Sequence, residues 1–139
     1  MDKITFDNIM NSIGGQIGQC RGPLFWLIGK IEMTNPHVIL ELGTGMGGSL
    51  KVWEQIVKPN DLVISVDIRD DLDRIIWDYK KSDRNIQLIT GDTLDKNTIF
   101  SVKQSLEGRK ADFLLIDGDH TYKYAKEDFI KYSPFVRRG

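Results

Sequence analysis

Four short, mostly apolar runs, each followed by a segment with helical spacing, constrain the fold of this chain most strongly. The runs cover residues 38–42, 62–66, 86–90 and 113–116. Their apolar residues are consecutive rather than alternate, which is the pattern of parallel strands covered on both faces. The four runs therefore predict a parallel sheet buried between two layers of helix.

The segments after the runs carry apolar residues at helical spacing, which predicts amphipathic helices. The four stripes are Leu50, Trp53 and Val57; Leu72, Ile75, Ile76 and Tyr79; Ile99, Val102 and Leu106; and Tyr122, Ala125, Phe129 and Tyr132. Thr121 is the predicted N-cap of the last helix, which Pro134 ends. Strands that alternate with single helices imply right-handed crossovers. The predicted fold class is α/β, a Rossmann-like, doubly wound, mostly parallel sheet with strand order 3-2-1-4.

We divide the chain into an N-terminal helical segment, residues 1–36, that packs on the core, and a cofactor-binding Rossmann-like domain, residues 37–139. A helix whose face is formed by Leu24, Leu27, Ile28 and Ile31 is predicted before the first strand. The first twenty residues predict either a short helix or a mobile arm. The sequence stops where a fifth strand would begin, so we expect a domain truncated before that strand.

Charge and cysteine content narrow the class of protein. The 19 Lys and Arg balance the 20 Asp and Glu, so nucleic acid is not expected as a partner. The longest apolar stretch is too short to span a bilayer, and no membrane partner is expected. The single cysteine, Cys20, excludes an intrachain disulfide and suits the cytoplasm. Trp26, Trp53 and Trp77 are predicted to be core residues, because they lie on apolar helix faces.

A glycine-rich loop follows the first predicted strand, with the sequence Glu41-Leu42-Gly43-Thr44-Gly45-Met46-Gly47-Gly48-Ser49. Glycines let the backbone turn tightly and approach a ligand, and the helix that follows presents free N–H groups. The loop therefore predicts a cofactor site. Gly43, Gly45 and Gly48 also satisfy the G-x-G-x-x-G dinucleotide fingerprint, with Asp67 near the spacing of its ribose-binding acid. The loop alone leaves NAD and S-adenosylmethionine both open.

Glu41 favours S-adenosylmethionine over NAD. A carboxylate in an otherwise apolar strand is costly to bury unless it meets a donor. The ammonium and sulfonium groups of S-adenosylmethionine could meet that need, whereas the pyrophosphate of NAD would be repelled. The alternative is a glutamate at a strand end that backbone N–H groups satisfy.

Two further acids follow the second and third predicted strands. Asp67 is placed for two ribose hydroxyls, because neighbouring parallel strands end at the same edge of a sheet. The alternative for Asp67 is a helix cap. Asp92 lies in a turn that could bring it to the adenine amino group, although Gly-Asp turns are common.

The fourth predicted strand ends in Ile116-Asp117-Gly118-Asp119-His120-Thr121-Tyr122, which places two carboxylates and an imidazole at the same edge. A histidine beside carboxylates can act as a general base near neutral pH, and oxygens of Asp117 could hold a hard divalent cation. The alternative for His120 is a cap or a surface role. We favour the functional interpretation because the glycine loop lies at the same edge. His37 precedes the first strand, at the opposite edge, and is predicted to be structural.

Together these motifs resemble the class I S-adenosylmethionine-dependent methyltransferases, in their cephalosporin-hydroxylase-like and small-molecule O-methyltransferase branch. The resemblance runs from about His37 to Gly139. It implies that Glu41, Gly43 and Gly45 line the methionine end of the cofactor, that Asp67 binds the ribose and that Asp92 approaches the adenine. The full set of cofactor-binding residues predicted in this way is Glu41, Gly43, Thr44, Gly45, Ser49, Asp67, Ile68, Asp92 and Asp117.

The resemblance also implies a reaction, the O-methylation of a small-molecule hydroxyl. In metal-dependent members the acid that ends the fourth strand binds Mg²⁺, which implies Asp117 here, and the histidine that follows takes the proton of the acceptor, which implies His120. Further metal ligands in that group follow a fifth strand, which this sequence does not contain. An NAD-dependent oxidoreductase and a catalytically silent binding module of the same fold are the alternatives. An exposed apolar helix at the N-terminus would make a homodimer reasonable.

Overall fold

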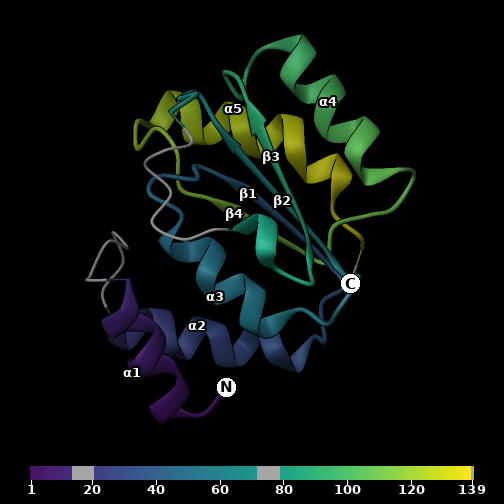
Figure 1. The fold of residues 1–139 in the computed structure, drawn as a ribbon. Helices are drawn as coiled ribbons and strands as arrows, with labels where there is room; N and C mark the ends of the chain where they lie inside the picture. Colours follow the sequence, from purple (N-terminus) through teal and green to yellow (C-terminus); the bar gives the residue numbers. More distant parts are fainter. Residues whose placement is uncertain (14–20, 72–78, 139) are drawn as a thin grey trace.

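The structure, a computed structural model, describes residues 1–13, 21–71 and 79–138. Four strands form one parallel sheet (Figure 1), and their bounds are β1 Val38–Leu42, β2 Leu62–Asp67, β3 Asn85–Thr90 and β4 Phe113–Ile116. The strand order is β3-β2-β1-β4. The predicted fold class, strand positions and strand order are therefore confirmed.

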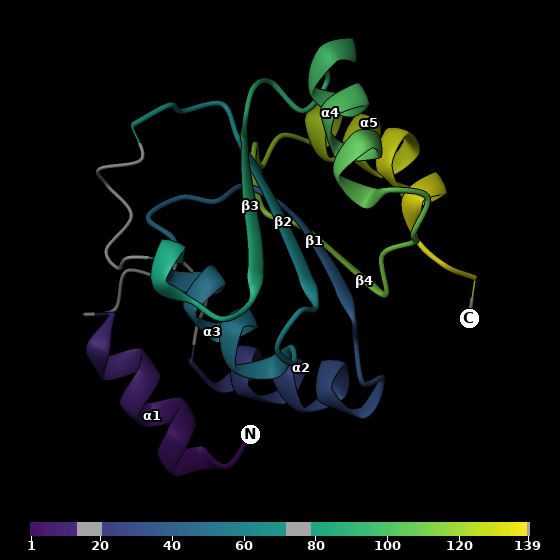
Figure 2. The same cartoon turned by 45° about the vertical axis from the view of Figure 1, so that its right-hand side comes forward.

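Helices cover both faces of the sheet. Within the described residues, the α-helices are α1 Lys3–Ser12, α2 Arg21–Met33, α3 Gly48–Ile56, α4 Lys96–Leu106 and α5 Tyr122–Tyr132, and the 3₁₀ helices are η2 Tyr79–Lys81 and η3 Ser133–Phe135. Figure 2 shows α4 and α5 on one face of the sheet and α3 on the other, with α2 and α1 beyond α3. The stripe at residues 72–76 lies outside the described residues, as do Cys20 and Trp77.

Alternate residues of β1 enter two separate apolar cores. Val38, Leu40 and Leu42 pack with the residues of α4 and α5, whereas Ile39 packs with α1, α2 and α3. All five residues of β1 are buried. Burial on both faces explains why the apolar residues are consecutive in the sequence.

The N-terminal residues form a helix rather than a mobile arm. The Asp2 side chain caps α1 and accepts a hydrogen bond from the Thr5 amide at 2.8 Å. The apolar side of α1 is buried within the chain, through Phe6, Ile9 and Met10. This side is therefore not available to a second copy of the chain. The homodimer stays a prediction, but the exposed apolar helix on which it was based is not found.

Two predictions about buried faces are wrong. Trp26 is 65% exposed, with the Lys30 ammonium 5.5 Å from its ring centre, so it is not a core residue. In α5 the buried residues are Asp128 and Tyr132, whereas Phe129 is 62% exposed. The predicted apolar face of this helix therefore combines residues from two sides of it. The side chain that is buried beside Tyr132 is the acid Asp128 and not the neighbouring Phe129.

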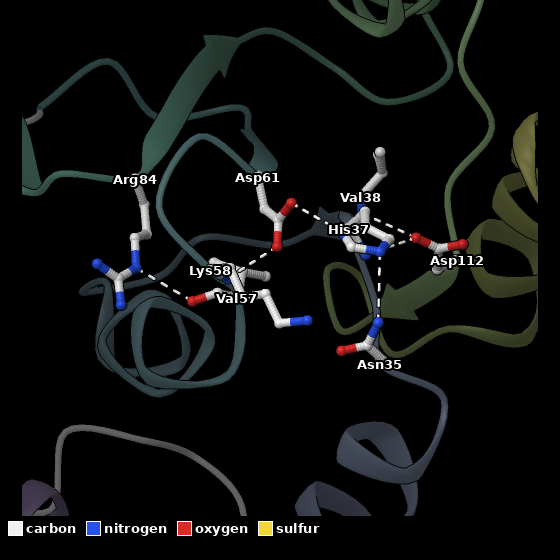
Figure 3. A network of polar contacts seen from close by, with 8 residues as sticks. All are labelled: Asn35, His37, Val38, Val57, Lys58, Asp61, Arg84 and Asp112. Atoms are coloured by element: carbon white, nitrogen blue, oxygen red, sulfur yellow. Dashed lines mark hydrogen bonds and ion pairs between the residues drawn. The ribbon is translucent and has the colours of Figure 1, made fainter.

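The amino ends of the strands are joined by a polar network (Figure 3). The Asp112 carboxylate accepts hydrogen bonds from the backbone amides of His37 and Val38, at 2.7 and 2.9 Å. The His37 imidazole lies 2.9 Å from the Asp61 carboxylate at the start of β2. These contacts tie β1, β2 and the start of β4 together and agree with the structural role predicted for His37.

The last described residues pair with Ala111, which precedes β4. The Ala111 amide donates to the carbonyl of Phe135, and the Arg137 amide donates to the carbonyl of Ala111, at 2.8 and 2.9 Å. Val136 thus forms an isolated parallel bridge with Ala111, one residue before the segment in which a fifth strand is predicted to begin. In the part of the chain that the structure describes, none of the helices combines the length and apolar character that a membrane crossing requires.

Candidate functional site

A cavity of about 750 Å³ lies at the carboxyl edge of the sheet and is lined by the segments that follow all four strands. Its volume is in the range of sites that hold small molecules and cofactors. Open α/β sheets bind ligands at this edge, where the strand order reverses. The lining residues are Gly43, Thr44, Gly45, Met46, Gly48, Ser49, Val66, Asp67, Ile68, Arg69, Gly91, Asp92, Thr93, Asp117, Gly118, Asp119 and Tyr124.

The structure brings most of the predicted site residues together. All of the predicted cofactor-binding residues except Glu41 line the cavity, and the predicted base, His120, does not line it. The cavity is also lined by residues that were not predicted as site residues, among them Met46, Arg69, Thr93 and Tyr124.

Gly43 allows the glycine loop to cross directly against the end of β4. Its φ is +104°, and a Cβ atom at this position would lie 2.3 Å from the carbonyl oxygen of Asp117. The Gly43 amide also donates to the carbonyl of Val66 at 2.7 Å. Only glycine combines this φ with so close a backbone approach. The loop that forms one cavity wall is therefore fixed by the absence of a side chain at Gly43.

Asp67 ends β2 and is bound from two directions. Its Oδ2 accepts from the Gly45 amide at 2.9 Å, and its Oδ1 accepts from the Arg69 amide at 3.0 Å and from Arg69 Nε at 3.2 Å. Burial raises the pKa of the Asp67 carboxyl, but the hydrogen bonds from Arg69 and Gly45 outweigh burial and lower it. Asp67 is therefore an anion in the cavity wall, and an ionised carboxylate can accept hydrogen bonds from two hydroxyl groups.

Glu41 is fully buried on the α3 face of β1 and lies outside the cavity lining. Its Oε1 accepts from Trp53 Nε1 at 3.0 Å, and its Oε2 accepts from the Ser65 hydroxyl at 2.7 Å. Protein side chains thus supply its donors, so the buried carboxyl of Glu41 does not require a cationic ligand. The Ser65 hydroxyl lies 2.7 Å from that of Thr44, which lines the cavity. Glu41 therefore supports the cavity wall through Ser65, and its direct contact with a cofactor stays a prediction.

The burial of Glu41 makes the stability of the protein depend on pH. Burial raises the pKa of the carboxyl from 4.5 to about 7, against hydrogen bonds from Ser49, Ser65 and Trp53, and the nearby Asp117 adds to the rise. Because the folded state holds this proton more tightly, the contribution of Glu41 is fully present below pH 4.5 and is lost as the pH rises through 7.

The wild type should lose roughly 3 kcal/mol of unfolding free energy between pH 4.5 and pH 8 that Glu41→Gln keeps. The stability of the variant relative to the wild type should therefore rise by this amount over the same pH range. The amide keeps the shape of the side chain and cannot ionise. Urea unfolding at the two pH values measures this difference, and Glu107→Gln, at a glutamate whose side chain is 74% exposed, is the control. A difference between variant and wild type that does not change with pH would contradict the expectation.

The segment after β4 brings carboxylates to the cavity but leaves the histidine outside its wall. Asp119 Oδ1 accepts from the Thr121 amide at 2.7 Å, and hydrogen bonding by Thr121 lowers the pKa of Asp119. Thr121 is the N-cap of α5, as predicted. His120 follows the lining residue Asp119 and is exposed. Its imidazole therefore meets solvent beside the cavity, and its role as a base stays a prediction.

The turn after β3 is held from behind by α5. The Tyr132 hydroxyl donates to the Thr93 carbonyl at 2.8 Å. Asp128 is 1% exposed, and its Oδ1 has no hydrogen-bond partner among the described residues. Burial raises the pKa of Asp128, although the Thr93 side chain opposes the rise. These buried groups fix the turn that carries Asp92 to the cavity.

Comparison with known families agrees with this geometry. Residues 40–139 match a family described as a methyltransferase domain. The chain belongs to this family. No curated protein matches the methyltransferase domain significantly.

Solved structures share the fold of the methyltransferase domain. An O-methyltransferase from Bacillus cereus, in complex with SAH, is 17% identical with a TM-score of 0.66, and the match covers 100% of this chain and 64% of that one. A Staphylococcus aureus protein, provisionally named a caffeoyl-CoA O-methyltransferase, is 19% identical with a TM-score of 0.70, and the match covers 99% of this chain and 63% of that one. The methyltransferase domain described here therefore spans less than two thirds of the length of these two proteins.

Magnesium at Asp117 stays a prediction for this methyltransferase domain. Within residues 1–13, 21–71 and 79–138, no three His, Cys, Asp or Glu side chains converge on a point where they could hold a metal ion. Mg²⁺ is usually held by one or two carboxylates and several waters, so this finding does not test the prediction for Asp117.

Proposed function

We propose that this domain binds S-adenosylmethionine in the cavity and transfers its methyl group to the hydroxyl of a small molecule. The observation that carries the proposal is the meeting of the glycine loop and the Asp67 carboxylate in one cavity, in a chain of the methyltransferase family. The Bacillus cereus protein of the same fold is an O-methyltransferase in complex with SAH, which supports both the cofactor and the hydroxyl acceptor. The cytoplasmic location and the cephalosporin-hydroxylase-like branch stay predictions.

The lining residues offer suitable partners for each part of the cofactor. Asp67 would accept hydrogen bonds from the ribose hydroxyls, and Asp92 from the adenine amino group. Ile68 lines the cavity although it is 69% exposed, so a flat apolar base would remove its side chain from water. The loop of Gly43, Gly45 and Ser49 would hold the methionine end at the start of α3.

S-adenosylmethionine, when bound, supplies a methyl group attached to a positively charged sulfur. A hydroxyl oxygen can attack the carbon of this methyl group, and S-adenosylhomocysteine is the leaving group. The protein contributes by holding the acceptor near that methyl group, which can supply roughly 7 to 11 kcal/mol of the barrier. His120 would remove the proton of the acceptor hydroxyl, because a neutral imidazole is a base near pH 7. The exposed carboxylate of Asp119 would stabilise the imidazolium that results.

We expect His120→Ala to lower the rate of methyl transfer about 100-fold without abolishing it. This is the lower end of what a placed base contributes, because the His120 side chain is exposed to water. The measurement is the formation of S-adenosylhomocysteine from S-adenosylmethionine with phenol, sugar and polyketide acceptors. His37→Ala, at the opposite edge of the sheet, is the matched control and should keep the wild-type rate. Full activity of His120→Ala would remove this residue from the mechanism.

A binding module without turnover is the second candidate. The observation that favours it is the position of His120, which is not among the lining residues of the cavity. Such a module binds S-adenosylmethionine and S-adenosylhomocysteine but produces no methylated product with any acceptor. Product formation above the uncatalysed rate in the same assay would exclude it.

A further inference from the structure

The Arg69 guanidinium lies against both carboxylate oxygens of Asp67, to which the ribose hydroxyls would bind in the proposed function. Asp67 Oδ1 accepts from Arg69 Nε at 3.2 Å, and Oδ2 lies 3.4 Å from Arg69 Nη2. The other two donors are backbone amides, those of Arg69 on Oδ1 and Gly45 on Oδ2, at 3.0 and 2.9 Å. A carboxylate has about four lone-pair positions. All four are therefore taken by the protein.

The backbone donors cannot make room for a ligand. The Gly45 amide belongs to the loop that Gly43 holds against the end of β4, and moving it would separate the loop from the sheet. The Arg69 amide is part of the chain that leaves β2. The ribose hydroxyls can therefore reach the Asp67 oxygens only at the two positions that the guanidinium holds.

The guanidinium is free to move in a way that the amides are not. The Arg69 side chain is 40% exposed and can turn into water, whereas that of Asp67 is 15% exposed. Its two bonds to Asp67 are also the longer pair of the four. The guanidinium is also attracted to a second carboxylate, that of Asp71, which raises the pKa of Arg69 in addition to the larger effect of Asp67.

We propose that Arg69 competes with the ligand's ribose for Asp67 and thereby limits how tightly the cavity binds adenosine-containing ligands. The inference rests on the proposed function. Binding breaks both guanidinium contacts, and only a ribose with two free hydroxyls restores both hydrogen bonds to the carboxylate. Arg69 therefore also reduces the preference of the cavity for a ribose over a sugar that lacks these hydroxyls, because only the ribose must displace the guanidinium.

The test is calorimetric titration of the whole chain with S-adenosylhomocysteine. Arg69→Met keeps the length and the apolar stem of the side chain but has no donor and no charge. We expect it to bind about fivefold more tightly than the wild type, the upper end of what a partly exposed ion pair contributes. Arg109→Met is the matched control, because Arg109 also pairs with an acid two residues away, Glu107 at 3.4 Å, and does not line the cavity.

A second pair of probes separates competition for Asp67 from a general effect of the charge. Adenosine should gain affinity in Arg69→Met, whereas 2′,3′-dideoxyadenosine should not, because it has no hydroxyls with which to displace the guanidinium. An equal gain for both nucleosides would overturn the inference. So would an unchanged or weaker affinity for S-adenosylhomocysteine, since Arg69 would then orient Asp67 or bind the ligand itself. If the wild type binds none of these ligands, the proposed function fails and the inference with it.

Discussion

Gly43→Ala is expected to lower the free energy of unfolding by about 4 kcal/mol. The new Cβ atom would lie 2.3 Å from the Asp117 carbonyl oxygen and 2.8 Å from the Gly118 amide nitrogen, and this backbone peptide cannot yield as a flexible side chain would. Overpacking of this kind costs about 1 to 3 kcal/mol, and a φ of +104° adds strain of roughly 1 to 3 kcal/mol. Urea unfolding measures the loss.

The chain contains a matched control for this prediction. Gly108, after α4, also has a positive φ, +79°, but a Cβ atom there would meet nothing within 4 Å. Gly108→Ala should therefore cost only about 1 kcal/mol, the strain of the conformation alone. Equal losses in the two variants would show that the loop does not lie against β4 as described.

Asp67→Ala is expected to weaken the binding of S-adenosylhomocysteine about 1000-fold. Hydrogen bonds to a charged group contribute about 1.5 to 3 kcal/mol each, and the variant loses both of those that the ribose would make. It also removes the acceptor of the Gly45 amide, which helps to hold the glycine loop. Calorimetric titration measures the affinity.

Asp61→Ala is the control for this variant, because Asp61 lies at the other end of the same strand. Like Asp67, Asp61 accepts from a backbone amide, that of Lys58 at 2.8 Å, but it lies in the polar network at the amino edge of the sheet. Its loss should leave the affinity unchanged. An affinity of Asp67→Ala within about threefold of the wild type would mean that the ribose does not bind this carboxylate.

The sheet could be predicted from the sequence because its signal is local. Each strand is a short run of buried residues, and strands that alternate with helices admit few topologies. The carboxyl edge follows at once from the strands, so residues directly after them, such as Gly43, Asp67 and Asp117, could be placed at one site. For these residues, the position directly after a strand in the sequence is enough to place them at the carboxyl edge of the sheet.

The partners of Glu41 could not be predicted in the same way, because they depend on the register of neighbouring strands. Glu41 and Ser65 are each the fourth residue of their strand, and the parallel register pairs them directly. A polar residue at the same position of two apolar runs was the available signal. Trp53 then completes the site from α3, where its indole was interpreted only as apolar.

The remaining differences concern side chains whose direction the sequence does not record. Arg69 lies in a loop without periodicity, so nothing in its neighbourhood indicated that it folds back onto Asp67. The inward direction of Asp128 in α5 contradicts the usual exposure of acids. His120 has the expected position in the chain, but its exposed side chain is not among those that line the cavity.

We propose that the cavity at the carboxyl edge of the sheet holds S-adenosylmethionine. Calorimetric titration of the whole chain with S-adenosylhomocysteine, and with NADH in parallel, tests it most directly. We predict saturable binding of S-adenosylhomocysteine at one site for each chain and no saturable binding of NADH. Binding of NADH without S-adenosylhomocysteine would contradict the account and would favour a dinucleotide site instead.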